Sequence, residues 1–178
     1  MPRGPWTTTQ SRIAYSTPRF SVYEDEVTRP DGTAGEYDWI QTSDQVRVAV
    51  LTGDHVLLVE QYHYLIGRTL QLPGGNVEDG ETAEIAAKRE LEQETGRRDG
   101  RWTSYGRLAP LPGLSPIYTH LWLVQDAVAG TAKPESVERD LRVVSMSLPD
   151  ALRAAYDNKI GCAASAALVF AVAGGLSA

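Results

Sequence analysis

The chain has 178 residues, 42% of them hydrophobic and 22% charged, with a formal net charge of −6 at pH 7. This length fits one domain, or one domain with a small appendage, and the composition is that of an ordinary globular protein. The acidic balance argues against a nucleic-acid partner, and the single cysteine, Cys162, excludes an internal disulfide and favours a reducing cytoplasm. The longest strongly apolar stretch, residues 162–172, is shorter than the ~20 residues of a membrane span, so we expect no membrane insertion.

Two segments precede the main body of the sequence. Residues 1–19 are rich in Thr, Pro, Arg and Ser without periodicity, which predicts a flexible N-terminal arm. In residues 20–43, alternating and aromatic residues flank a Pro-Asp-Gly turn at residues 30–32, which predicts a small antiparallel β extension. Residues 44–178 are expected to form the main domain.

The main domain alternates predicted strands with predicted helices, a pattern typical of an α/β fold. Two β-branched runs meet at the turn residues 52–54, and a glycine-rich loop follows them. A helix is expected from Ala83 to Thr95, because Thr82 is a good N-cap and Gly96 stands where a left-handed C-cap belongs. Further strands are expected at residues 102–110, 119–127 and 141–148, and further helices at residues 149–158 and 162–173.

The expected helix carries carboxylates on a face that should be buried. At about 100° per residue, Glu94 falls within about 60° of Glu90, on the same stripe as the small residues Ala83, Ala86 and Ala87. Charged positions on a helix are often only a solvated face, but this stripe is the one that would pack against a sheet. Two carboxylates near a low-dielectric surface cost several kcal/mol unless a cation neutralises them.

A divalent metal ion would satisfy both carboxylates. Mg²⁺ binds one or two carboxylates, keeps water ligands and accepts phosphate oxygens. The preceding loop, residues 72–75, ends in two glycines and allows close approach of its backbone, so a carbonyl oxygen there could be a third ligand. Arg89 lies about 100° from Glu90 around the helix and could instead pair with one of the carboxylates.

The stretch from Gly75 to Arg97 resembles the Nudix box, G-x5-E-x7-R-E-U-x-E-E-x-G-U, in which U is a bulky aliphatic residue. Two positions depart from it, because Gln93 replaces a glutamate and Arg97 replaces the final aliphatic residue. The flanking stretches "LLVEQYHY" and "LPGLSPIYTHLWL" are similar to the ADP-ribose pyrophosphatase branch of this family. The matching positions of the box are Gly75, Glu81, Arg89, Glu90, Leu91, Glu94 and Gly96.

The resemblance implies a fold and a reaction. The fold is a Nudix α/β/α sandwich on a mixed sheet, with N-terminal strands that form a homodimer interface. The reaction is the Mg²⁺-dependent hydrolysis, with Mn²⁺ as an alternative metal, of a nucleoside diphosphate linked to another group, such as ADP-ribose or a nucleotide sugar. The products are a nucleoside monophosphate and a phosphorylated compound.

The resemblance also assigns roles within the box. Two glutamates bind the metal, a loop carbonyl oxygen completes the set, and an arginine pairs with the first glutamate of the box. Gln93 stands beside them and offers only a neutral amide oxygen. The metal-binding glutamates would be Glu90 and Glu94, and the carbonyl oxygen would come from Gly74. The arginine would be Arg89, paired with Glu81.

Four residues are expected on the substrate side of the site. Pro112 corresponds to a proline that follows the box in ADP-ribose enzymes, and Glu81 belongs to the box itself. Trp39 could stack on a base, although an aromatic residue in a strand often only packs. His63 could contact substrate or could be an ordinary histidine on a strand face.

The general base of related enzymes lies in the loop before the last strand. Here that loop carries Glu138, which we favour as the residue that takes a proton from water, and also Glu135 and Asp140. A solvated turn without a catalytic role is the alternative interpretation of the same residues.

Three substitutions keep other functions open. Gln71, His63 and Ile117 stand where the branch has Glu, Arg and an acidic residue, so charges near the substrate are missing. The first hypothesis is the hydrolase described above. The alternatives are a Nudix-fold module that binds a nucleotide sugar with little or no catalysis, and a Nudix-fold enzyme that acts on a phosphorylated intermediate of a specialised pathway.

Overall fold

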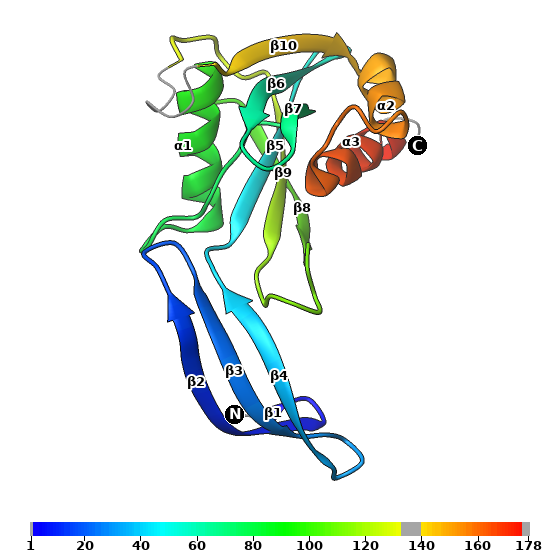
Figure 1. The fold of residues 1–178 in the computed structure, drawn as a ribbon. Helices are drawn as coiled ribbons and strands as arrows, with labels where there is room; N and C mark the ends of the chain where they lie inside the picture. The colour runs from blue at the N-terminus through cyan, green and yellow to red at the C-terminus, as the bar shows by residue number, and fades with distance from the viewer. Residues whose placement is uncertain (1, 133–139, 176–178) are drawn as a thin grey trace. The chain divides into compact units, whose positions relative to one another are not determined.

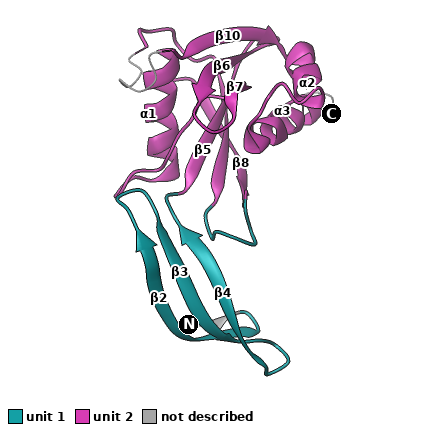
Figure 2. Cartoon of the chain, viewed as in Figure 1, with its two compact units in different colours: residues 1–43, 111–117 teal, residues 44–110, 118–178 magenta. Residues whose placement is uncertain are grey.

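A computed structural model of the chain describes residues 2–132 and 140–175. The chain forms two compact units, which Figure 2 colours separately. The N-terminal unit contains residues 1–43 and 111–117, and the main unit contains residues 44–110 and 118–178. In the described part of the chain, no helix combines the length and the apolar character that a membrane crossing requires.

The N-terminal unit is an antiparallel sheet with the strand order β1-β2-β3-β4. A turn joins β3 to β4, and Asp31 stabilises it by accepting hydrogen bonds from the backbone N–H and the hydroxyl of Thr33. Gly32 in this turn has a φ of 83°, which a glycine adopts without strain. The strands are β1 (Pro2–Arg3), β2 (Trp6–Ser16), β3 (Ser21–Thr28) and β4 (Ala34–Gln41).

Strand β2 differs from the sequence-based expectation. The prediction of a flexible arm over residues 1–19 is wrong, because residues 6–16 pair with β3 as a long strand. Most side chains of β2 are exposed on both faces of the sheet, so the strand shows no alternation of apolar and polar residues. Backbone pairing to β3, rather than burial of its own side chains, holds it in place.

The main unit is built on a mixed sheet with the strand order β10-β6-β5-β9-β8, and β7 pairs with β6. β5 and β9 are parallel, whereas the other neighbouring strands are antiparallel. The strands are β5 (Gln45–Thr52), β6 (His55–His63), β7 (Gly67–Gln71), β8 (Arg101–Leu108), β9 (Thr119–Gln125) and β10 (Arg142–Ser147).

Helices cover both faces of this sheet, as Figure 1 shows. Helix α1 (Ala83–Thr95) lies on one face, and α2 (Leu148–Tyr156) and α3 (Ala163–Gly175) lie on the other. Side chains along β5 alternate between the two faces of the sheet, which explains the two layers. Val46, Val48 and Val50 pack with α1. Ala49 and Leu51 pack with α2 and α3. The predicted α/β/α sandwich is confirmed.

The bounds and caps predicted for helix α1 are confirmed. The hydroxyl of Thr82 accepts a hydrogen bond from the backbone N–H of Ile85, and Gly96 closes the helix with a φ of 68°. Ala86 and Ala87 are fully buried against the sheet, as the small-residue stripe predicted. This stripe brings the polar C-terminal half of the helix against the same face of the sheet.

A buried hydrogen bond joins α3 to the loop that follows β7. The hydroxyl of Ser165, which is 0% exposed, accepts from the backbone N–H of Leu72 at 3.0 Å. Leu72 is also fully buried, so this donor lies away from water. The bond therefore holds the start of the glycine loop against the helix on the opposite face of the sheet.

We expect the substitution Ser165→Ala to lower the free energy of unfolding. It leaves the buried N–H of Leu72 without its acceptor, which costs about 1–3 kcal/mol. The better helix propensity of alanine returns only about 0.5 kcal/mol, so a net loss of about 1–2 kcal/mol is expected. Urea denaturation followed by circular dichroism measures it. Ser145→Ala, at an exposed position of β10, is the matched control, and an equal midpoint for the two variants would contradict the prediction.

Candidate active site

The glycine loop passes closely between strand β5 and helix α1. The carbonyls of Pro73 and Gly75 accept hydrogen bonds at 2.9 Å from the backbone N–H groups of Val48 and Val46 of β5. Gly74 has a φ of 145°, and a Cβ at this position would collide with the carbonyl of Val46. A side chain at Gly74 is therefore excluded by the backbone of β5.

Glu94 lies at the other side of this loop, at the C-terminal end of α1. It is 2% exposed, and its Oε2 accepts a hydrogen bond of 2.8 Å from the backbone N–H of Gly74. The carboxylate of Glu90, one turn earlier in α1, approaches the loop so closely that a Cβ on Gly75 would collide with it. The two glutamates thus face the same short stretch of backbone, as the sequence predicted.

Arg89 is the centre of a polar network on the same side of the helix. Its Nε and Nη2 donate to the two carboxylate oxygens of Glu81, each at 2.9 Å. Its Nη1 donates to Glu90 at 2.8 Å and to the amide oxygen of Gln93 at 3.1 Å. Nη2 also donates to the carbonyl of Asn76 at 2.9 Å, which ties the loop to the helix. The Arg89–Glu81 contact that the resemblance implies is present.

The network changes the proton affinities of its members. The hydrogen bond from Arg89, opposed by partial burial, lowers the pKa of Glu81 below its usual range. The same hydrogen bond raises the pKa of Arg89 further, so its guanidinium stays charged at every pH at which the protein folds. The pair is therefore a fixed charge arrangement that orients Glu90 and does not titrate near neutral pH.

The donor set of this site fits a single divalent cation. Among the described residues, no group of three or more His, Cys, Asp or Glu side chains is placed to hold a metal, so backbone oxygens would complete the set. Glu81, Glu90 and Glu94 with the one guanidinium of Arg89 leave two negative charges when all are ionised. These hard oxygen donors suit Mg²⁺, and Gln93 adds no charge to them.

Other candidates from the sequence lie elsewhere in the main unit. His63 is at the end of β6, and its Nε2 is buried without a hydrogen-bond partner in the described part of the chain. Glu135 and Glu138 lie outside the described residues. Asp140 is described, and it accepts a hydrogen bond from the backbone N–H of Tyr62 at 3.0 Å and lies 3.6 Å from Arg68. Asp140 is thus engaged with the sheet.

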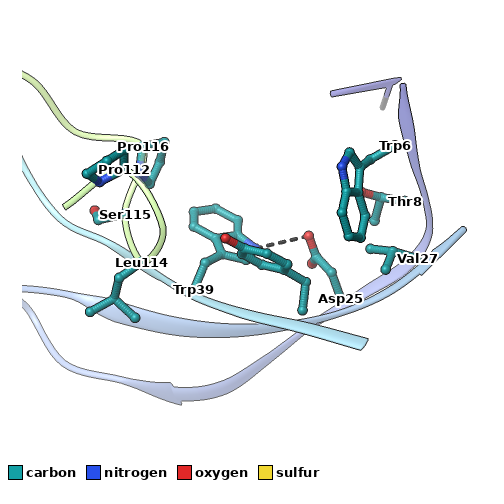
Figure 3. Close-up of a pocket in the computed structure, with 10 residues that line it drawn as sticks. Trp6, Thr8, Asp25, Val27, Trp39, Pro112, Leu114, Ser115 and Pro116 are labelled. Atoms are coloured by element: carbon teal, nitrogen blue, oxygen red, sulfur yellow. Dashed lines mark hydrogen bonds between the residues drawn. The ribbon is translucent and has the colours of Figure 1, made fainter. Parts of the chain in front are cut away.

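Trp39 and Pro112 belong to the N-terminal unit, where they line a pocket of about 240 Å³ (Figure 3). Trp6 and Tyr37 add aromatic walls, with their ring centroids 6.1 Å apart in an edge-to-face arrangement. The ring of Tyr23 stacks on Trp39 at 4.3 Å and covers one of its faces. The pocket therefore combines three aromatic side chains with aliphatic and proline surface.

Asp25, which was not expected from the sequence, also lines this pocket. Asp25 is 4% exposed and accepts a hydrogen bond from Nε1 of Trp39 at 3.0 Å (Figure 3). It also accepts one from the hydroxyl of Ser11 at 2.5 Å. A signal for it exists in the alternation of β3, where Tyr23, Asp25 and Val27 share one face. A charged side chain on the same face of a strand as buried side chains is costly to bury, so its presence indicates a special role or specific partners.

Comparison with known proteins adds the family. A family model described as NUDIX domain matches residues 42–161, and a model described as nucleoside diphosphate sugar hydrolase N-terminal domain matches residues 6–40. The ADP-ribose pyrophosphatase of Bacillus subtilis (strain 168) is 30% identical over 146 residues, which cover 78% of this chain and 79% of the relative. The ADP-sugar pyrophosphatase of Mus musculus is 36% identical over 103 residues, or 54% of this chain and 47% of the relative.

One solved structure and one further relative are also similar to this chain. The structure of an ADP compounds hydrolase matches with a TM-score of 0.86 and 20% identity, and covers 97% of this chain and 94% of that one, which shows a common fold. The methanol dehydrogenase activator of Bacillus methanolicus is 26% identical over 143 residues, or 76% of this chain and 75% of the relative. With the box, the α/β/α sandwich and the domain match in agreement, the chain belongs to the Nudix family.

Proposed function

We propose that the protein hydrolyses the pyrophosphate linkage of a nucleoside diphosphate derivative of the ADP-ribose or nucleotide-sugar type, with Mg²⁺ as cofactor and Mn²⁺ as a substitute. The observation that carries this proposal is the placement of Glu90 and Glu94 against the backbone of Gly74 and Gly75. Relatives named ADP-ribose pyrophosphatase and ADP-sugar pyrophosphatase support the substrate class.

The chain's residues would hold the cation and orient it. A divalent ion, when bound, neutralises the phosphate charge that repels an attacking water and acidifies that water. Glu90 and Glu94 supply carboxylate oxygens, and Gly75 leaves the space that the carboxylate of Glu90 occupies. Arg89 donates to both Glu81 and Glu90, so the hydrogen bond from its Nη1 restrains the orientation of the Glu90 carboxylate.

We propose Glu138 as the general base, with Glu135 as the alternative. The support comes from Asp140, whose carboxylate is already engaged by the backbone of Tyr62 and by Arg68. A carboxylate held in this way is a weaker candidate for taking a proton from water, which favours Glu138 or Glu135.

The remaining candidates are proposed to contact the substrate. The aromatic pocket lined by Trp39 and Pro112 would take the nucleobase, because flat aromatic walls suit a flat ring. His63 shares a strand face with Leu57, which packs in the core cluster of α1, so its buried Nε2 lies on the helix α1 side of the sheet. This position supports a role for His63 beside the phosphates.

The protein is further proposed to act as a cytoplasmic homodimer that binds small nucleotides and not nucleic acids. β1 covers only Trp6 and Thr7 of β2, so the outer edge of β2 beyond them is unpaired within the described residues. Such a long exposed strand edge favours pairing with another chain, which supports residues 20–43 and β2 as the dimer interface. The single Cys162 supports a reducing compartment, and the net charge of −6 argues against a nucleic-acid partner.

Glu90→Gln and Glu94→Gln are expected to lower kcat/KM by more than about 100-fold, because each removes a charged metal ligand. The assay is release of a nucleoside monophosphate from ADP-ribose, ADP-sugars, GDP-sugars, dinucleotides and nucleoside triphosphates, with Mg²⁺ or Mn²⁺. Glu92→Gln is the matched control on the exposed side of α1 and should keep full activity. Circular dichroism checks that each variant is folded.

Absence of turnover by the wild type, with every substrate and at every metal concentration, would overturn the hydrolase. Isothermal titration calorimetry with ADP-ribose then decides the alternative. Binding that is tight, independent of metal and unaccompanied by turnover would instead support a Nudix-fold binding module.

The Glu81–Arg89 pair predicts a pH dependence of stability. Because the folded-state pKa of Glu81 is lowered, its stabilising effect is present above the unfolded pKa, about 4.3, and is lost as pH falls through the folded value. Glu81→Gln should therefore cost about 2 kcal/mol at pH 7, and the difference from the wild type should shrink below about pH 4. Chemical denaturation at a series of pH values measures it.

The control for this pair is Glu84→Gln, which removes an exposed i, i+4 partner of Lys88 on the same helix. Its effect should stay below about 0.5 kcal/mol at every pH. The prediction would be contradicted if the free energies of unfolding of Glu81→Gln and the wild type differed by the same amount at every pH. The lowered pKa could then not be assigned to this pair.

Gln93→Glu tests the departure from the box. The new carboxylate would raise the net negative charge of the group formed by Glu81, Glu90, Glu94 and Arg89 from two to three. We therefore expect half-maximal activity at a lower Mg²⁺ concentration and binding of an additional ion. Activity measured as a function of Mg²⁺ concentration provides the first readout and Mn²⁺ titration by electron paramagnetic resonance the second. Unchanged metal dependence in both would show that position 93 has no influence.

A further inference from the structure

A guanidinium buried between β5 and the start of α3 has no carboxylate partner in the described part of the chain. Arg47 of β5 is 8% exposed, and its Nη1 donates to the carbonyl of Val46 at 2.9 Å. Its Nε donates to the sulfur of Cys162 at 3.4 Å. None of the ion pairs among the described residues involves Arg47. A buried charge is costly unless it is paired, so this guanidinium needs an anion close to it.

The sulfur of Cys162 is the group that meets this guanidinium. Cys162 is half-buried and directly precedes α3, where its carbonyl accepts a hydrogen bond of 3.0 Å from the backbone N–H of Ala166. Besides Nε of Arg47, the backbone N–H and the hydroxyl of Ser165 donate to the sulfur. The hydroxyl of Ser165 accepts from Leu72, so its own hydrogen can point to the sulfur. Three donors directed at one sulfur favour the thiolate, because a thiolate only accepts.

The surroundings of Cys162 explain which protonation state is stable. Burial raises the pKa of its thiol, but the positive charge of Arg47 and the hydrogen bonds from Ser165 and Arg47 outweigh burial, so the pKa lies below its usual range. Arg47 is the only ionised side chain in the described part of the chain whose charge acts on this thiol. The thiolate is the nucleophilic form of cysteine, and a partly exposed thiolate beside a cation at the start of a helix is a reactive one.

A second polar group on the same face of the sheet has no partner. Thr119 of β9 is 1% exposed, and its Oγ1 has no hydrogen-bond partner among the residues that the structure describes. Thr119 pairs with Gln45, and Leu121, two residues further along β9, pairs with Arg47, so Thr119 and Arg47 lie on one face. This face therefore carries a guanidinium and an unused hydroxyl, and it suits an oxygen added to the sulfur of Cys162 better than an apolar core would.

We propose that Cys162 is a thiolate paired with Arg47 and that a hydroperoxide oxidises it to a sulfenic acid. The sulfur attacks the distal oxygen of the peroxide, so that an S–O bond forms as the O–O bond breaks and an electron pair passes from sulfur to the peroxide. The distal oxygen keeps its hydrogen, and the alkoxide or hydroxide that leaves takes a proton from water. Cys162 is the single cysteine of the chain, so no internal disulfide can follow. The proposal is independent of the proposed hydrolase activity and requires only the folded chain.

The test exposes the reduced wild type to hydrogen peroxide in the presence of dimedone, a reagent that traps sulfenic acids. Mass spectrometry of the peptide that contains Cys162 measures the rate of labelling at about pH 7. Arg47→Gln removes the positive charge and should lower this rate by about tenfold, because a smaller fraction of the sulfur is then ionised. Arg47→Lys keeps a positive charge and should lose less. Circular dichroism checks that each variant is folded.

Two further variants are the controls. Arg153→Gln removes an exposed arginine of α2, which pairs with Asp150, and it should keep the wild-type rate. Cys162→Ser should show no labelling. A wild type that is not labelled at Cys162 would overturn the proposal, and so would a folded Arg47→Gln variant that reacts as fast as the wild type.

A second measurement needs no variant. The rate at which iodoacetamide alkylates Cys162 is measured between about pH 5 and about pH 10, for the folded wild type and for the same protein unfolded in urea. Because the pKa of the thiol is lowered in the folded state, the rate should reach its plateau at a lower pH than in the unfolded chain. Partial burial slows the folded protein equally at every pH and leaves the midpoint in place. A folded midpoint that equals or exceeds the unfolded one would overturn the proposal even if Arg47→Gln does not fold.

Discussion

The close approach of the glycine loop to both β5 and α1 is the constraint on which the site depends. Backbone hydrogen bonds from Val46 and Val48 fix the loop to the sheet, and a side chain at Gly74 is excluded by collision with the backbone of Val46. At Gly75, the carboxylate of Glu90 occupies the space that a Cβ would take. The buried alanines of α1 allow the helix to lie equally close to the same strand. Once sheet, loop and helix are packed in this way, Glu90 and Glu94 face the loop backbone without any further adjustment.

Charge balance explains why this packing is tolerated. Two carboxylates near a sheet would be unstable alone, and Arg89 compensates only part of their charge because it also binds Glu81 on both oxygens. The rest is available to a divalent ion, which the hydrolysis of a charged anhydride also requires. Gln93 contacts the arginine through its amide oxygen and adds no charge. In the proposed function, the residues that balance charge in this packing are also the ones that hold the metal.

The sequence was informative where local rules apply. The caps Thr82 and Gly96 bounded α1 correctly, and the spacing of the box located Glu81, Arg89 and Glu90 before any coordinate was known. Strand β2 could not be recognised, because a strand held only by backbone pairing leaves no pattern in its side chains. Tertiary contacts between distant segments also cannot be predicted from local sequence patterns, because each depends on where separate parts of the chain meet.

Asp25 shows the limit most clearly. Its partners are a neighbour in the sheet, Trp39, and a residue of the unrecognised β2, Ser11. Part of the pocket wall comes from the distant residues 111–117. No single stretch of sequence contains enough of this pocket to reveal it. The contacts among Glu81, Arg89 and Glu90, by contrast, lie within one continuous stretch from Gly74 to Gly96, so the resemblance to the box could indicate them.

The N-terminal unit is discontinuous in sequence, and this has a consequence for how it is made and inherited. Residues 111–117 complete the pocket wall, so the unit cannot finish folding until the ribosome has also synthesised β5 to β8 of the main unit. Transfer of residues 1–43 to another protein would carry the sheet but not the pocket. The pocket is consequently not a detachable module, and it can only evolve together with the loop that follows β8.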